Sequence, residues 1–261
     1  MSKILEVKNL TAKYGNRFIL NGYSFDLQEG EFVCLVGPNG CGKSTLLKTL
    51  LGIKGTDLSV SGTVLCKQVD VLRCSKRKTV ARNISYLSQN ETFAWSLKAR
   101  DVVLQGRYCY SGNIFAYTKE DYAECEKAFA FLEIDDLKER NIAGLSGGEF
   151  QKVRIARCIA QNSSCILLDE PLGCLDFGYE TDLITKLKEY CRKEKAGIIM
   201  SVHNLNLAFR FADKILTVDK NGRCIIGTVE EIMDTDILDE VYKVKFKKYY
   251  NQEVKAMQLY V

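Results

Sequence analysis

Histidine is nearly missing from this chain of 261 residues: it occurs once, as His203, and proline occurs only twice, as Pro38 and Pro171. With one histidine, and with no CxxC spacing among the 11 cysteines, a Cys/His metal cluster cannot be assembled. The cysteines are odd in number and scattered through strand-like and helix-like segments. We therefore expect reduced thiols that are buried as small hydrophobic side chains.

Long hydrophobic runs are also missing, since no segment approaches the roughly 18 apolar residues that a membrane-spanning helix requires. The first ten residues, MSKILEVKNL, lack the apolar stretch of a signal peptide. Lys and Arg number 37 against 33 Asp and Glu, and the net charge of +4 is too small to indicate a nucleic-acid partner. These absences predict a cytoplasmic protein that binds no nucleic acid and reaches a membrane only through a partner.

The apolar pattern predicts an α/β core interrupted by a helical insertion. Short apolar segments such as FVCLV and CILL are expected to be buried strands, and in the second half strands alternate with helices as in a parallel sheet. Between about 95 and 162 the pattern is helical, with Tyr122, Cys125, Phe129 and Leu132 predicted on the buried face of one helix.

The segment GPNGCGKST follows one buried strand and opens a helix, which is the context of a phosphate-binding loop. Its glycines let backbone N–H groups turn toward phosphate oxygens, and the helix N-terminus adds a favourable dipole. Lys43 is predicted to reach the β- and γ-phosphates, and the Ser44 hydroxyl to bind Mg²⁺. The candidate loop residues are Gly37, Pro38, Asn39, Gly40, Cys41, Gly42, Lys43, Ser44 and Thr45.

Two adjacent carboxylates, Asp169 and Glu170, follow the apolar segment CILL. Neighbouring residues of a strand face opposite sides, so the two carboxylates are expected to have different functions. Asp169 is predicted to belong to the Mg²⁺ shell, and Glu170 to act as the general base on the attacking water. A phosphate loop and an acidic strand end still leave kinases, GTPases and helicases open.

The segment LSGGE, from Leu145 to Glu149, places a hydroxyl and two glycines at the start of another helix. Ser146 is a candidate N-cap, and such a helix start can also bind an anion. A second phosphate-binding helix start in one chain is redundant unless two copies face each other across the same nucleotide.

With these motifs in this order, the chain from about residue 3 to 230 resembles an ABC-type ATPase, the nucleotide-binding subunit of an ABC transporter. The resemblance implies an α/β fold: a RecA-like P-loop NTPase core with a mainly parallel sheet, an N-terminal antiparallel β-subdomain and an inserted α-helical subdomain. Within a single ABC ATPase domain, residues 1–92 and 163–230 would form the core. Residues 93–162 would form the helical subdomain and 231–261 a C-terminal tail.

The same resemblance implies ATP and Mg²⁺ as cofactors and a head-to-tail dimer of two copies. Each ATP would lie between the phosphate loop of one copy and Ser146, Gly147 and Gly148 of the other. Asp176 would shape the dimer contact beside the site of hydrolysis.

Three further residues gain roles from the resemblance. Tyr14 would stack on adenine, and Gln89 would contact the Mg²⁺ and water shell and report the nucleotide state to a membrane partner. His203 would orient the γ-phosphate and the attacking water. The implied catalytic residues are therefore Glu170, His203, Lys43 and Gln89, and the implied metal-binding residues are Ser44, Gln89 and Asp169.

The sequence departs from the family pattern at two places. Gly173 and Cys174 stand where Ser-Ala is more usual, and their small size is expected to preserve the backbone geometry. Asn204 follows His203 where Asp is usual, and an asparagine can still cap the next helix.

Other segments are most similar to the ATPases of importers for iron–siderophore, haem and cobalamin, among them GRYCYSG (106–112) and DEVYKVKF (239–246). This similarity implies a peripheral subunit on the cytoplasmic face of the cell membrane. Its partners would be an integral membrane permease and, indirectly, an extracytoplasmic substrate-binding protein. The alternatives are a soluble ABC ATPase of iron–sulfur cluster assembly and the ATPase of an ABC exporter.

Overall fold

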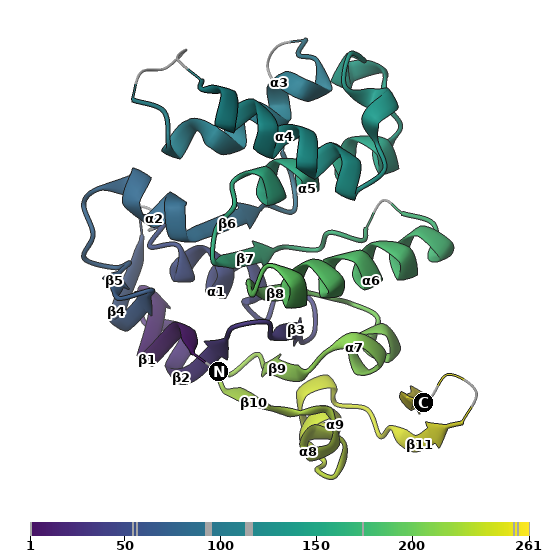
Figure 1. Ribbon diagram of the computed structural model, residues 1–261. Helices are drawn as coiled ribbons and strands as arrows, with labels where there is room; N and C mark the ends of the chain where they lie inside the picture. Colours follow the sequence, from purple (N-terminus) through teal and green to yellow (C-terminus); the bar gives the residue numbers. More distant parts are fainter. Residues whose placement is uncertain are drawn as a thin grey trace.

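Three sheets and the helices around them make up the part of the chain that the computed structural model describes, residues 2–53, 55, 57–91, 96–112, 117–173, 175–252, 254 and 256–260 (Figure 1). The strands are β1 (Lys3–Tyr14), β2 (Arg17–Gln28), β3 (Phe32–Val36), β4 (Leu58–Cys66), β5 (Val69–Asp70), β6 (Ile84–Leu87), β7 (Cys165–Leu168), β8 (Gly197–Ser201), β9 (Lys214–Val218), β10 (Cys224–Thr228), β11 (Lys247–Asn251) and β12 (Ala256–Tyr260). The helices are α1 (Lys43–Leu50), α2 (Arg77–Asn83), α3 (Ala99–Leu104), α4 (Lys119–Phe131), α5 (Gly147–Ala160), α6 (Phe177–Lys193), α7 (Leu205–Phe211), α8 (Val229–Met233) and α9 (Ile237–Tyr242).

The central sheet has the strand order β10-β9-β3-β8-β7-β6. Its strands run parallel from β9 to β6, and β10 joins the edge in the antiparallel direction. A separate antiparallel sheet has the order β2-β1-β4-β5, and β11 pairs with β12 in a hairpin. The predicted α/β class, with a mainly parallel core sheet and an N-terminal antiparallel sheet, is confirmed.

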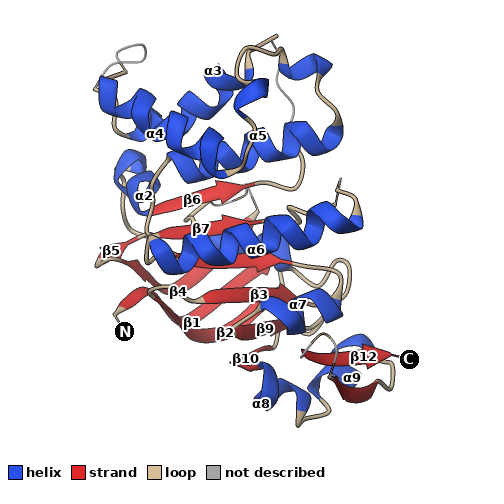
Figure 2. Cartoon of the chain, turned by 45° about the vertical axis from the view of Figure 1, so that its right-hand side comes forward, coloured by secondary structure: helices blue, strands red, loops and turns tan. Residues whose placement is uncertain are grey.

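The parallel strands of the central sheet separate two hydrophobic cores. In β3, Phe32, Cys34 and Val36 pack into the core that contains residues of α3 to α7. Val33 and Leu35 pack into the second core, with β1, β2 and α1. Since successive side chains of a strand face opposite sides, covering both faces makes every residue of FVCLV buried. In Figure 2, α6 crosses one face of this sheet.

The helices α3, α4 and α5 lie together at the upper end of the molecule in Figure 1, which confirms the predicted helical insertion. A capping box between Thr118 and Asp121 begins α4. Cys125, Phe129 and Leu132 are buried as predicted, whereas the prediction for Tyr122 is wrong, because this residue is 55% exposed. Asp121 lies on the buried side instead, where its Oδ1 is 2.9 Å from Nε of buried Arg107.

The cysteines behave as the sequence predicts in the part of the chain that the structure describes. Ten are free thiols, and eight of these are buried. Burial raises the pKa of Cys66 to about 12 and that of Cys158 to about 11, so both stay protonated at neutral pH. Cys174 lies outside the described residues.

Among the described residues, no helix combines the length and the apolar composition that crossing a membrane requires.

Candidate functional site

The phosphate-binding loop lies between the end of β3 at Val36 and the start of α1 at Lys43. Gly40 and Gly42 have φ values of 73° and 112°, in the left-handed region that glycine adopts without a steric penalty. Gly42 is the N-cap of α1, and no side chain caps this helix. The first N–H groups of α1 therefore remain for a bound anion, as in helix N-termini that bind phosphate.

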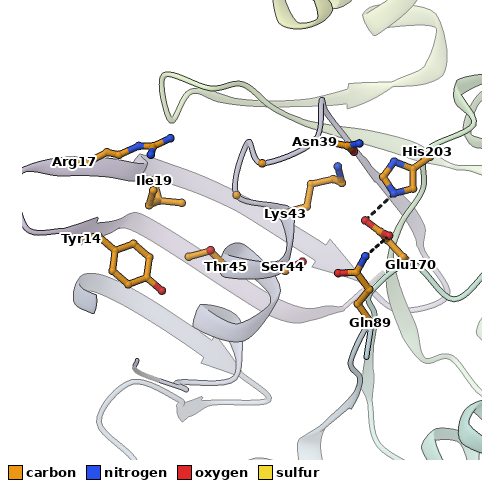
Figure 3. A pocket seen from close by; sticks show the side chains of 12 residues that line it. Tyr14, Arg17, Ile19, Asn39, Lys43, Ser44, Thr45, Gln89, Glu170 and His203 are labelled. Carbon is orange, nitrogen blue, oxygen red and sulfur yellow. Dashed lines mark hydrogen bonds and ion pairs between the residues drawn. The ribbon is translucent and has the colours of Figure 1, made fainter. Parts of the chain in front are cut away.

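A cavity of about 560 Å³ opens in front of this loop (Figure 3). Its lining brings together residues from five distant parts of the chain: Tyr14, Arg17, Ile19, Asn39, Gly40, Gly42, Lys43, Ser44, Thr45, Gln89, Glu170 and His203. Figure 3 shows Tyr14 at one end of the cavity and Glu170 at the other, with Lys43 between them. An elongated ligand with an aromatic group beside Tyr14 and an anionic group beside Lys43 fits this arrangement.

Lys43 is the buried cation of the cavity, with an exposed fraction of 6%. Its Nζ donates to the Gly37 carbonyl at 2.8 Å and lies 3.4 Å from the Pro38 carbonyl. The amine is thus held under the loop at the place where phosphate oxygens would lie. The Cys41 side chain is buried under the same loop, so only its backbone is in a position to contact a ligand there.

Glu170 is held between Gln89 and His203 at the far end of the cavity (Figure 3). The Gln89 amide donates to Glu170 Oε2 at 2.6 Å, and His203 Nε2 lies 2.7 Å from Glu170 Oε1. The three side chains come from the ends of β6, β7 and β8, so the parallel sheet brings them together. Each carboxylate oxygen has two lone pairs, so Glu170 can still accept a proton from a water molecule.

Asp169 and Glu170 follow β7, which ends at Leu168. Their side chains point in different directions, but the alternation of side chains along a strand is not the cause, because both residues lie beyond the strand. Glu170 has φ of 50°, in the left-handed region, and its backbone N–H donates to Ser201 Oγ at 2.7 Å. The same Ser201 hydroxyl donates to Asp169 Oδ1 at 3.0 Å. One hydroxyl of β8 thereby fixes the turn that sends Glu170 into the cavity and leaves Asp169 behind it.

The surroundings of the Asp169 carboxylate are suited to binding a hard cation such as Mg²⁺. Its carboxylate is buried, with 1% exposed, and accepts from Ser201 and, at 3.4 Å, from the Tyr86 hydroxyl. Burial, and then the Asp169 charge, raise the pKa of Tyr86, which therefore remains a neutral donor. The two hydroxyl groups orient the carboxylate but carry no charge, so its negative charge is available to attract a cation. Asp169 is not among the residues that line the cavity, whereas Ser44 and Gln89 are. A carboxylate, a hydroxyl and an amide oxygen are nevertheless the ligand types that Mg²⁺ prefers.

The segment LSGGE, from Leu145 to Glu149, is called the signature segment from here on, and it lies in a second concave site of about 530 Å³. This site is lined by Ser146, Gly147, Gly148, Glu149, Lys152, Leu175, Asp176 and Tyr179. The chain therefore carries two separate concave sites, which are called the two half-sites below. The phosphate loop, Gln89, Glu170 and His203 line one, whereas the signature and Asp176 line the other.

Ser146 caps α5 as the sequence predicts. Its hydroxyl accepts from the Glu149 N–H at 3.3 Å, while Glu149 Oε2 accepts from the Ser146 N–H at 2.7 Å. These bonds from Ser146, assisted by Arg140, hold the pKa of Glu149 below its ordinary value. The helix start at the second half-site is thereby fixed before any ligand binds.

The loop that carries His203 connects β8 to α7. Asn204 is the N-cap of α7, with its Oδ1 accepting from the N–H groups of Asn206 at 3.0 Å and Leu207 at 3.3 Å. The expected capping role of Asn204 is confirmed.

Gly173 and Cys174 are the other place where the sequence departs from the family pattern. Gly173 is exposed, and Cys174 falls outside the described residues.

Sequence reasoning missed four residues around the site. Arg17 and Ile19, at the start of β2, line the cavity beside Tyr14. Ser201 and Tyr86 hold Asp169 from the neighbouring strands. All four lie within two residues of a strand end, but a single side chain at such a position belongs to no motif that would mark it in the sequence.

The sequence pattern of the ABC transporter family matches residues 20–173, more than half of the chain. The petrobactin import ATP-binding protein FpuD of Bacillus anthracis is 32% identical over 246 residues, which cover 94% of this chain and 88% of that protein. The ferric enterobactin transport ATP-binding protein FepC of Escherichia coli is 30% identical over 241 residues, with 92% of this chain and 88% of that protein covered.

A solved structure of a metal-chelate type ABC transporter in an inward-facing conformation superposes with a TM-score of 0.84. It is 25% identical and covers 100% of this chain and 98% of the other. The chain belongs to the ABC transporter family, and it is an ATP-binding cassette, the ATPase of an ABC transporter.

Proposed function

We propose that the chain is the ATP-hydrolysing subunit of an importer for an iron–siderophore, haem or cobalamin-type metal chelate. It would act on the cytoplasmic face of the membrane as a head-to-tail dimer bound to a permease, which would receive its cargo from an extracytoplasmic binding protein. FpuD is named for petrobactin import and FepC for ferric enterobactin transport, and this supports a chelated metal as cargo.

The observation that carries the dimer is the separation of the two half-sites on one chain. Ser146 to Gly148 line one concave site, and Lys43, Glu170 and His203 line another. A nucleotide in the phosphate cavity would therefore meet a signature segment only when a second copy supplies it. Asp176, which lines the signature site, would lie at this contact.

Within the phosphate cavity, we assign Tyr14 to adenine and the phosphate loop with Lys43 to the phosphates. Gln89 and His203 hold the two carboxylate oxygens of Glu170. In this orientation the carboxylate would face the end of the phosphate chain. Glu170 takes the proton of the attacking water, and His203 orients that water and the γ-phosphate. Bound Mg²⁺, held by Ser44, Gln89 and Asp169, would neutralise charge that develops on the phosphate oxygens.

The transporter assignment is tested by purifying the tagged chain from membranes of the cells that produce it. We expect a stable complex with a many-helix permease, and transport assays with the associated binding protein should show ATP-dependent uptake of a metal chelate. Recovery of the chain only with soluble iron–sulfur assembly proteins would contradict the proposal, and so would ATP-dependent export by the purified complex.

His203→Ala tests the role of the histidine in hydrolysis. We expect kcat to fall by roughly 10- to 100-fold, since the alanine leaves Glu170 and the attacking water without their orienting partner. ATP affinity should stay within about twofold, because binding depends on the phosphate loop and Tyr14. Steady-state ATPase kinetics and nucleotide titration measure the two quantities, and unchanged turnover would refute the role.

A further inference from the structure

The C-terminal tail packs against the helix that follows His203. After β10 the chain forms α8 and α9 and then the hairpin of β11 and β12, which stays separate from the central sheet. Figure 2 shows this hairpin beside α7, and β12 contacts α7 directly. Leu259 of β12 is buried in the same hydrophobic core as Leu207 and Ala208 of α7. The tail is therefore part of the structure around this helix.

One polar side chain joins the two elements with paired hydrogen bonds. Asn206, in the first turn of α7, accepts from the Leu259 N–H at 2.7 Å through Oδ1. Its Nδ2 donates to the Leu259 carbonyl at 3.2 Å. The amide thus satisfies both backbone groups of one β12 residue, as a neighbouring strand would do. A packing contact alone would leave α7 free to slide along β12, whereas this pairing fixes its position.

The first turn of α7 in turn determines where His203 lies. The backbone of the histidine is held on one side by the end of β8, where Val202 N–H donates to Leu35 O at 3.0 Å. On the other side it is held by Asn204, which caps the N–H groups of Asn206 and Leu207. The His203 side chain itself is 50% exposed, so few neighbours restrain the ring. A helix of seven residues is also too short to be stable without tertiary contacts.

We propose that Asn206 is a positioning residue for ATP hydrolysis. By pairing with Leu259, it holds the start of α7 so that His203 Nε2 meets Glu170 Oε1. The inference rests on the role proposed for His203. Through this pairing the tail, which lies beyond the residues that the family pattern matches, influences the hydrolytic end of the cavity.

The single histidine gives this proposal a direct measurement. In the full-length chain labelled with ¹⁵N-histidine, the ring signals belong to His203 alone and need no assignment. We expect Asn206→Ala to move and broaden these signals, because the start of α7 loses its connection to β12. In the same variant kcat should fall by about tenfold, which corresponds to a loss of about 1.4 kcal/mol in the transition state. KM for ATP should change by less than about twofold, since the phosphate loop is untouched.

Lys188→Met is the matched control, because it removes a hydrogen bond at the other end of the same helix, together with an ion pair to Asp213 just beyond the helix. Lys188 Nζ donates to the carbonyl of Phe211, the last residue of α7, at 2.6 Å. We expect this variant to lower the thermal melting temperature about as much as Asn206→Ala. Its histidine ring signals and its kcat should nevertheless match those of the wild type. Equal movement of the ring signals in both variants would reduce Asn206 to a general stabiliser of α7 and overturn the proposal.

Asn206→Asp supplies a second variant if the alanine chain does not fold. It keeps an acceptor for the Leu259 N–H and loses the donor to the Leu259 carbonyl, so we expect a smaller movement of the same signals. Unmoved ring signals in the folded variant would overturn the proposal. The experiments distinguish a failure of the role proposed for His203 from a failure of the proposal for Asn206. If only the role of His203 is wrong, His203→Ala would keep its turnover, while the ring signals of Asn206→Ala would still move.

Discussion

Glu170→Gln is expected to trap the chain as an ATP-bound dimer with kcat reduced by roughly 10²- to 10⁴-fold, the usual contribution of a general base. The new amide is isosteric, and its oxygen can still accept from Gln89 or His203. Its NH2 group must instead donate, so the other partner has to present an acceptor atom, and with that change the cavity should retain its shape. It cannot take a proton from water, and bound ATP therefore persists. Size-exclusion chromatography with saturating Mg-ATP measures the dimer, and single-turnover assays measure hydrolysis.

Glu31→Gln is the matched control for this prediction. Glu31 is also a partly enclosed carboxylate beside a cationic group, with its Oε1 2.8 Å from Lys214 Nζ. It lies just before β3, whereas Glu170 follows the end of β7, so the two carboxylates are at opposite ends of the parallel strands. This variant should hydrolyse ATP at the wild-type rate. If Glu170→Gln stays monomeric with saturating Mg-ATP, the head-to-tail dimer is wrong, and if it hydrolyses ATP normally, the base is another group.

Lys43→Ala is expected to abolish most nucleotide binding and to lower kcat/KM by about 10³-fold or more. The amine is buried and anchored to the Gly37 carbonyl, so its positive charge acts on the phosphates in a site with little screening by water. Equilibrium binding of a fluorescent ATP analogue and steady-state ATPase assays measure the two effects.

Thr49→Val separates this charge effect from damage to α1. Thr49 is fully buried in the same helix, and its hydroxyl donates to the Thr45 carbonyl at 2.7 Å. Its substitution by an isosteric apolar side chain should leave ATP binding intact. Wild-type binding by Lys43→Ala would refute the assignment of the phosphate loop, whereas equal losses in both variants would attribute the effect to the helix.

Several site residues could be predicted from the sequence because their motifs are local. The phosphate loop needs glycines at fixed spacing and a helix directly after it, and both requirements are visible in GPNGCGKST. The capping of α5 by Ser146 and of α7 by Asn204 is also a local property, since the cap and its partners lie within three residues. The functional roles of these residues remain predictions that the variants above test.

Contacts between distant segments could not be predicted in the same way. Nothing in the sequence links Ser201 to Asp169 and Glu170, which lie about thirty positions earlier, because their contact depends on β7 and β8 being neighbours in the sheet. Of the residues predicted on the buried side of α4, Tyr122 alone was wrong, for a related reason. Asp121 can face the interior only because Arg107, from another element, pairs with it there.

The sequence by itself determined the buried strands, the helical insertion, the phosphate loop and the helix caps, because each follows from apolar periodicity or from groups a few residues apart. Only the tertiary structure decided that Gln89, Glu170 and His203 meet at one point and that the signature lies in a separate half-site. It also decided that Asn206 pairs with β12. These arrangements depend on strand order and on how the helices pack, which are properties of the whole chain and leave no local pattern to recognise.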